Sequence, residues 1–147
     1  TSVGLLEVLS GQAPLEAALC KDTLTDAMVL PVAASAFTPK DVFGSEAMHN
    51  LIEELKRRFD VVLFDTAPIL PIAEARVVAT LADAVVVLTA WRRTSHSATR
   101  AAVDALESVG AQVAGIAMTR VDLRAKEQHD ESDPSHYYKS YRSYYVD

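Results

Sequence analysis

One carboxylate, Asp65, directly follows the apolar run 61–64 and precedes Thr66, Ala67 and Pro68. A short apolar run without polar alternation predicts a strand that is covered on both faces of a sheet. Ligands of open α/β sheets bind beyond the carboxyl ends of the strands, where a carboxylate can hold Mg²⁺ beside nucleotide phosphates. The alternative is an aspartate that caps a turn. The run alone leaves both roles open for Asp65.

A cluster of phenol hydroxyls lies near the C-terminus, where all five tyrosines fall: Tyr137, Tyr138, Tyr141, Tyr144 and Tyr145. Serine, lysine and arginine separate them, which favours a solvated segment able to reach an active site. Each phosphorylation would add about −1.5 to −2 charges at neutral pH. The alternatives are an aromatic patch that packs on the domain and a stacking platform for single-stranded nucleic acid. The net charge of −6 argues against nucleic acid as a partner.

Strands and helices that would position these residues alternate along the chain. A first helix is expected to open with Thr38 as N-cap and Pro39 as its first residue. A second helix is predicted over 71–81 and a third over 94–109, ended by Gly110. The predicted strands are 28–33, 61–65, 84–89 and 113–118.

The apolar spacing of two helices predicts which of their faces are buried. The first helix would bury Met48, Leu51, Ile52, Leu55 and Phe59. The third would bury Ala98, Ala101, Ala105 and Val109.

The alternation of strands and helices predicts an α/β fold with a mainly parallel sheet covered by helices. Residues 4–9 and 15–20 are expected to form a short helical excursion before the first strand. We expect residues 1–121 to form the folded body and residues 122–147 to form a flexible tyrosine-rich tail. The single cysteine, Cys20, excludes an internal disulfide framework.

The segment 58–68, which contains Asp65-Thr66-Ala67-Pro68, resembles the Walker B segment of bacterial tyrosine kinases. These are the cytoplasmic kinases of exopolysaccharide and capsule export systems, and relatives of the MinD/ParA-type P-loop ATPases. The family usually has Asp-Thr-Pro-Pro, so Ala67 is a departure. Further segments resemble family motifs in the same order, namely 4–11, 30–33, 82–88 and 115–121. The resemblance implies a truncated P-loop NTPase fold in which Asp65 is the Mg²⁺ ligand and catalytic carboxylate.

The phosphate-binding loop of that family is absent from the sequence. Its pattern, Gly-x-x-x-x-Gly-Lys-(Ser/Thr), holds phosphate oxygens with backbone N–H groups. None of the five glycines, Gly4, Gly11, Gly44, Gly110 and Gly115, is followed by lysine, and the Asp-x-Asp motif that precedes the family's Gly-Leu segment is also missing. In the family both lie before the position of Thr1. We therefore expect the isolated chain to be inactive, with ATP and Mg²⁺ needing residues that it lacks.

Two residues are nucleotide-binding candidates by resemblance. The family often has asparagine at the position of Thr119, near the nucleobase, and a hydroxyl lacks the paired geometry of an amide. Arg120 would either stack on the base or face solvent. Arg92 and Arg93, before Thr94, would approach phosphate or a neighbouring subunit, or else lie in a solvated loop.

The resemblance also implies an activity and partners. The parent would be an ATP-dependent tyrosine autokinase that regulates polysaccharide synthesis and export, with the tail tyrosines as acceptors. It would form homo-oligomers at the cytoplasmic face of the inner membrane. A membrane-spanning co-polymerase region or adaptor and a tyrosine phosphatase would be its partners. The alternatives are a MinD/ParA-like ATPase without kinase activity and a degenerate, noncatalytic interaction module.

Overall fold

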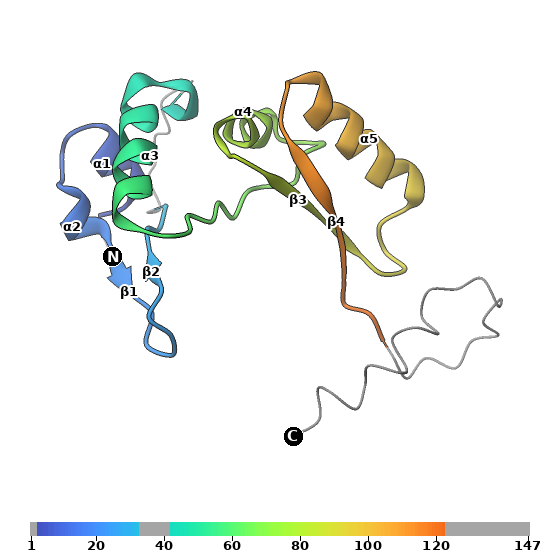
Figure 1. The fold of residues 1–147 in the computed structure, drawn as a ribbon, viewed down its shortest axis with the longest axis horizontal. Helices are drawn as coiled ribbons and strands as arrows, with labels where there is room; N and C mark the ends of the chain where they lie inside the picture. Colours follow the sequence, from blue (N-terminus) through green and yellow to red (C-terminus); the bar gives the residue numbers. More distant parts are fainter. Residues whose placement is uncertain (1–2, 33–41, 123–147) are drawn as a thin grey trace.

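The computed structural model describes residues 3–32 and 42–122 (Figure 1). The predicted helix start at Thr38-Pro39 and the tail from residue 123 onward, with its tyrosines, lie outside the described residues. Within the described part, no helix is long and apolar enough to cross a membrane.

Helices and short strands follow one another along the chain, which confirms the predicted α/β class. The helices are α1 (Leu5–Leu9), α2 (Leu15–Ala18), α3 (Glu46–Arg58), α4 (Ala73–Leu81) and α5 (His96–Ser108), with a 3₁₀ turn, η1 (Val42–Gly44). The strands are β1 (Cys20–Lys21), β2 (Met28–Val29), β3 (Val85–Ala90) and β4 (Val113–Thr119).

The third and fourth predicted strands are confirmed as β3 and β4, which pair in parallel. The helix α5 connects them, as parallel pairing requires a long crossover (Figure 1). The backbone N–H of Val85 donates to the carbonyl oxygen of Gln112 over 2.7 Å at the start of the pair. A small core of Ala79, Val87, Leu106 and Ala111 fixes α4 and α5 against this sheet.

The first two predicted strands are largely wrong. In the described part of the run 28–33, which is 28–32, the strand is limited to Met28–Val29. It pairs antiparallel with β1, which begins at Cys20, a residue predicted to end a helix. The turn between them is closed by the N–H of Asp22, which donates to the carbonyl of Ala27 over 2.9 Å. The run 61–65 belongs to no strand, because no other strand in the described part pairs with it. Among the described residues, one parallel and one antiparallel strand pair stand in place of the predicted mainly parallel sheet.

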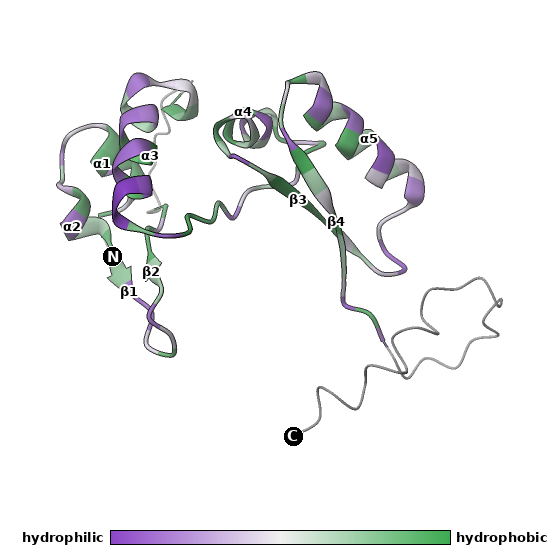
Figure 2. Ribbon diagram, in the orientation of Figure 1, coloured by the Kyte–Doolittle hydropathy of each residue, from purple (hydrophilic) through white to green (hydrophobic). Residues whose placement is uncertain are grey.

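The N-cap of α3 is Ser45, and the helix start predicted at Thr38 lies outside the described residues. The hydroxyl of Ser45 accepts a hydrogen bond from the N–H of Met48 over 3.2 Å. The predicted apolar face is confirmed, since Met48, Leu51, Ile52 and Leu55 are buried and Phe59 packs against them. Figure 2 shows the opposite, hydrophilic face of α3. Leu15 of α2 completes this first core.

The buried face of α5 differs from the prediction. Ala102 and Leu106 are its buried residues, whereas Ala101 and Val109 are exposed. Alanines are spaced around several faces of this helix, so their spacing does not show which face is buried. The buried face is the one on which Leu106 packs with Val87 and Ala79. The predicted end of the helix is confirmed, because Gly110 follows α5 with a φ of +81°, a conformation that glycine adopts without steric cost.

Arg58, on the charged side of α3, links this helix to α2 by an ion pair. Its guanidinium lies 2.7 Å from a carboxylate oxygen of Glu16 on α2 and 3.0 Å from one of Glu54. The pKa of the Glu16 carboxyl is lowered, first by a hydrogen bond from its own backbone N–H and then by Arg58.

Replacing Leu106 by alanine is predicted to destabilise the fold by roughly 2–5 kcal/mol, because it opens a cavity in a fully buried position. Leu106 is 0% exposed, and the control Leu24→Ala changes a side chain that is 91% exposed. Urea unfolding monitored by circular dichroism would measure both free energies. Equal losses in the two variants would contradict the assigned core.

Replacing Arg58 by glutamine is predicted to raise the pKa of Glu16 toward its ordinary value. A lowered carboxyl pKa stabilises the folded state above the unfolded-state pKa, and this contribution is lost as pH falls through the folded-state pKa. The variant should therefore lose less of its stability on acidification. Side-chain carboxyl NMR would follow Glu16, with Arg57→Gln as the matched charge control. An unchanged Glu16 titration in Arg58→Gln would rule out the pairing.

Candidate functional site

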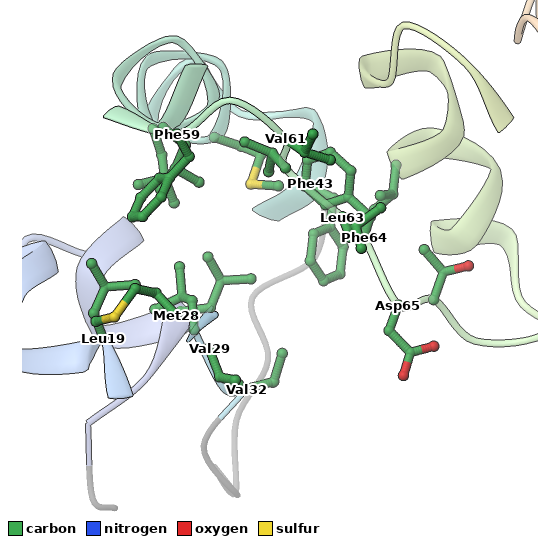
Figure 3. Close-up of a pocket in the computed structure, with 18 of the residues that line it drawn as sticks. Leu19, Met28, Val29, Val32, Phe43, Phe59, Val61, Leu63, Phe64 and Asp65 are labelled. Carbon is green, nitrogen blue, oxygen red and sulfur yellow. The ribbon is translucent and has the colours of Figure 1, made fainter. Parts of the chain in front are cut away.

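Asp65 lies in the irregular segment between α3 and α4, and its side chain is exposed. The residues before it alternate: Val62 and Phe64 pack against the first core, whereas Val61 and Leu63 are exposed. Figure 3 shows Asp65 at one end of a pocket, beyond Leu63 and Phe64, with its carboxylate apart from the apolar side chains. The structure thus presents this carboxylate to solvent, although the strand predicted to carry it does not form.

The pocket beside Asp65 has a volume of about 780 Å³ and is lined mainly by apolar side chains. Met28 and Val29 of β2 and Phe59 after α3 are among the apolar side chains that line it (Figure 3). Among the described residues, its charged lining residues are Asp26, Asp65 and Glu74, and no described lysine, arginine or histidine lines it. Phosphates are bound by cations and N–H donors. The pocket therefore suits an apolar occupant better than the phosphates of a nucleotide.

No sequence pattern indicated that Asp26 and Glu74 would share a pocket with Asp65, because the three come from separate segments. Glu74 is the acidic residue of the first turn of α4, where a carboxylate has an ordinary role opposite the helix dipole. Asp26 forms an ion pair with Lys21 over 2.8 Å. In the described part of the chain, no three His, Cys, Asp or Glu side chains form a group that could hold a metal ion.

The other predicted binding residues, Thr119 and Arg120, lie at the carboxyl end of β4. The hydroxyl of Thr119 donates to the carbonyl oxygen of Thr89 over 3.1 Å, so its proton is already engaged within the sheet. The carbonyl of Thr119 accepts from the N–H of Trp91 over 2.9 Å. These bonds bring the ends of β3 and β4 together.

Both strands are followed by an arginine in the left-handed region, with a φ of +58° at Arg92 and at Arg120. Residues other than glycine adopt this conformation infrequently. The guanidinium of Arg92 lies 4.5 Å from the ring centre of Trp91, within the range of a cation–π interaction. The hydroxyl oxygen of Thr94 accepts a hydrogen bond from the N–H of Ala90 over 3.0 Å, and this bond closes the turn. No sequence pattern predicts positive φ at arginine.

The two halves of the predicted site are not in direct contact. Among the described residues, no hydrogen bond or ion pair joins Asp65 to Thr119 or Arg120. Thr119 and Arg120 are adjacent to the Trp91–Thr94 turn, whereas Asp65 belongs to the pocket. The tyrosines predicted as phosphate acceptors lie outside the described residues.

No family model matches the chain. Curated relatives are nevertheless similar to it over most of its length. The succinoglycan biosynthesis transport protein ExoP of Rhizobium meliloti is 28% identical over 148 residues, which cover 98% of this chain and 19% of ExoP. The tyrosine-protein kinase CpsD of Streptococcus pneumoniae is 28% identical over 120 residues, which cover 82% of this chain and 53% of CpsD. The chain thus spans about half of CpsD and about a fifth of ExoP.

Solved kinase domains share its fold. The VpsO kinase domain matches with a TM-score of 0.76 at 22% identity, over 82% of this chain and 60% of that domain. The kinase domain of the Escherichia coli tyrosine kinase ETK matches with a TM-score of 0.75 at 20% identity, over 88% of this chain and 51% of that domain. The family resemblance predicted from the motifs is therefore confirmed: in sequence and in fold, the chain is similar to part of the kinase domains of the bacterial tyrosine kinases of exopolysaccharide and capsule biosynthesis.

Proposed function

We propose that this chain is the C-terminal portion of an ATP-dependent protein tyrosine autokinase that regulates the synthesis and export of a surface polysaccharide. The observation that carries the proposal is the colinear similarity to CpsD and ExoP together with a fold shared with solved tyrosine kinase domains. Within that fold the exposed carboxylate of Asp65 follows the motif-bearing run that predicted it.

Asp65 is the proposed Mg²⁺ ligand and catalytic carboxylate. Mg²⁺ keeps several waters and is commonly bound by one or two protein carboxylates together with substrate phosphates, so a single exposed carboxylate fits such a site. ATP would supply the phosphoryl group, with Mg²⁺ neutralising charge on its phosphates. The phosphate-binding loop is not found, since the sequence has no Gly-Lys pair and no cation among the described residues lines the pocket beside Asp65. The isolated chain should therefore not turn over ATP.

Thr119 and Arg120 are proposed to contact the nucleobase. They lie at the carboxyl end of a parallel strand, the edge at which open α/β sheets bind ligands. The left-handed backbone at Arg120 is consistent with a functional position, where strain of this kind is concentrated. The hydroxyl of Thr119 is already bonded to Thr89, so Arg120 would provide the larger share of the contact.

The tail is proposed to accept phosphate on Tyr137, Tyr138, Tyr141, Tyr144 and Tyr145. Transfer between subunits of a homo-oligomer would allow a solvated tail to reach the active site of a neighbour. Phosphates would make the tail strongly anionic and change what it docks against. A membrane-spanning co-polymerase region or adaptor would hold the assembly at the cytoplasmic face of the inner membrane, and a tyrosine phosphatase would reverse the modification.

A second candidate function is a noncatalytic interaction module. The specific observation in its favour is that the pocket beside Asp65 is lined mainly by apolar side chains and that its charged lining residues in the described part of the chain are carboxylates. The phosphorylation state of the tail in cells separates the two functions.

Asp65→Asn, introduced into the encoding gene, is predicted to lower tail phosphotyrosine by on the order of 10²-fold, because it removes the charge that orients the metal. Asp60→Asn is the matched control, since it makes the same change in the same segment and Asp60 is also exposed. Quantitative phosphopeptide mass spectrometry would measure the tail in both strains. Equal phosphorylation in the two variants would remove Asp65 from the catalytic site.

Phosphopeptides of the native protein are predicted to carry phosphate within residues 137–145. Replacing all five tyrosines by phenylalanine should abolish the phosphotyrosine signal without unfolding the body, because the changes fall in the proposed tail and not among the core residues of the described part. Anti-phosphotyrosine blotting and the unfolding midpoint would report the two effects. A tail that is unmodified in native cells would favour the ATPase or the interaction module.

A further inference from the structure

A stretch of sequence without any acidic side chain runs from Ala84 to Val103, across β3 and the first half of α5. It carries Arg92, Arg93 and Arg100, in a chain whose net charge is −6. All three arginines are exposed in the structure. Positive charge is therefore concentrated where the chain leaves β3 and enters α5.

The turn after β3 brings Arg93 close to the start of α5. Its N–H donates to the carbonyl oxygen of Ala90 over 3.0 Å, and α5 begins at His96. Arg100 lies about 6 Å further along the helix axis, and helix side chains tilt toward the N-terminus, so Arg100 leans back toward this turn. The positive end of the helix dipole lies at the same place. We call Arg92, Arg93 and Arg100 the basic surface.

The basic surface differs from other cationic positions of the fold in its pairing. Lys21, Lys56 and Arg58 each form an ion pair with a carboxylate. Among residues 3–32 and 42–122, no ion pair joins Arg93 or Arg100 to a carboxylate. An anionic segment could therefore bind these two guanidinium groups without first displacing a carboxylate of the described part.

An acidic segment follows β4 closely along the chain. Residues 127–133 contain no lysine or arginine and four carboxylates, on Glu127, Asp130, Glu131 and Asp133. Because β4 is parallel to β3, the chain leaves β4 at the edge where the turn after β3 lies (Figure 1). The N–H of Trp91 donates to the carbonyl oxygen of Thr119 over 2.9 Å and holds the two strand ends together. The acidic segment is thus tethered beside the basic surface.

The tether is long enough for contact and short enough to favour it. Asp130 follows Asp122 by eight residues, which span at most about 26–29 Å when extended. Exposed ion pairs are individually weak. A short tether compensates for this weakness, because it keeps the segment at an effective concentration in the millimolar range.

We propose that the acidic segment 127–133 docks on the basic surface of the same chain. Its carboxylates accept charge-assisted hydrogen bonds from the guanidinium groups of Arg93 and Arg100, and the dipole of α5 favours negative charge at this end. The tyrosine segment 137–145 is the poorer occupant, since its charged residues are Lys139 and Arg142. The inference depends only on charges of this chain and goes beyond the proposed kinase function.

Paramagnetic relaxation in the full chain tests the contact. Cys20 is the only cysteine, so Cys20→Ser combined with Ser132→Cys places a single nitroxide inside the acidic segment. At low salt we expect broadened amide signals over residues 93–100 and sharp signals over Glu46–Arg58 of α3. In 1 M salt, where the Debye length is about 3 Å, the broadening over 93–100 should disappear.

Substitution of the basic surface gives a graded effect. Arg93→Gln and Arg100→Gln should each lower the docking equilibrium constant by about 2–5-fold, because each removes one exposed ion pair. Arg57→Gln is the matched control, since Arg57 is also an exposed arginine but lies on α3. The broadening over 93–100 reports the docked fraction in each variant.

The acidic partner is tested from its own side. Asp130→Asn combined with Glu131→Gln removes two ion pairs and should lower the docking constant by about 4–25-fold. Asp60→Asn combined with Glu53→Gln is the control, because it makes the same two changes at exposed positions of the body. Every residue substituted in the body is exposed, apart from Cys20, so the unfolding midpoints of the charge variants should match.

The outcomes separate the proposal from its alternatives. Salt-sensitive broadening that both sets of surface variants weaken and both controls keep supports it. Broadening confined to residues 119–122, or broadening over 93–100 that salt and the variants leave unchanged, overturns it. A mixture of isotope-labelled chain without nitroxide and unlabelled chain with nitroxide gives the last test. Equal broadening in that mixture would assign the surface to the tail of a second copy and overturn docking within one chain.

Discussion

The parallel pairing of β3 with β4 is the constraint on which the rest of the second core depends. Its ladder aligns the two strand ends, so that the Trp91 turn and Thr119 share a hydrogen bond. The crossover helix α5 has to lie on one face to connect parallel strands, and Leu106 is buried there as a result. In a two-stranded ladder, the backbone N–H and C=O groups form hydrogen bonds on one side of each strand. The same constraint therefore creates both the packed face and the open edge.

The first core depends on the packing of helices rather than on the pairing of strands. The helix α3 packs its apolar face on α1 and α2, and Arg58 holds α2 through Glu16. The segment 61–64 leaves this core and leads toward α4 with no ladder of its own. Asp65 is consequently positioned by side-chain packing of Val62 and Phe64 rather than by a sheet. This explains how the carboxylate can be displayed at a pocket without a strand beneath it.

Residue spacing and turn residues correctly predicted the features that depend on neighbours close in the sequence. The apolar face of α3, the glycine that follows α5 and the strands β3 and β4 follow from periodicity and turn residues. The strand at 61–65 was wrong because a strand exists through its neighbours, and sequence pattern does not show whether these are present. The face of α5 was wrong because alanine spacing is nearly degenerate around that helix. Asp65 was predicted from its motif and its role stays a prediction, whereas its acidic pocket neighbours come from separate segments and had no sequence signal.

The left-handed arginines after β3 and β4 have a consequence for variation among related sequences. Glycine adopts this backbone freely, and asparagine does so more readily than most residues. Drift under stability alone would therefore carry both positions toward glycine or asparagine. If the guanidinium itself is under selection at both sites, arginine persists there in spite of this backbone cost. A comparison of many descendants of the same ancestral gene would then show arginine kept at these two turns while the flanking polar residues diverge.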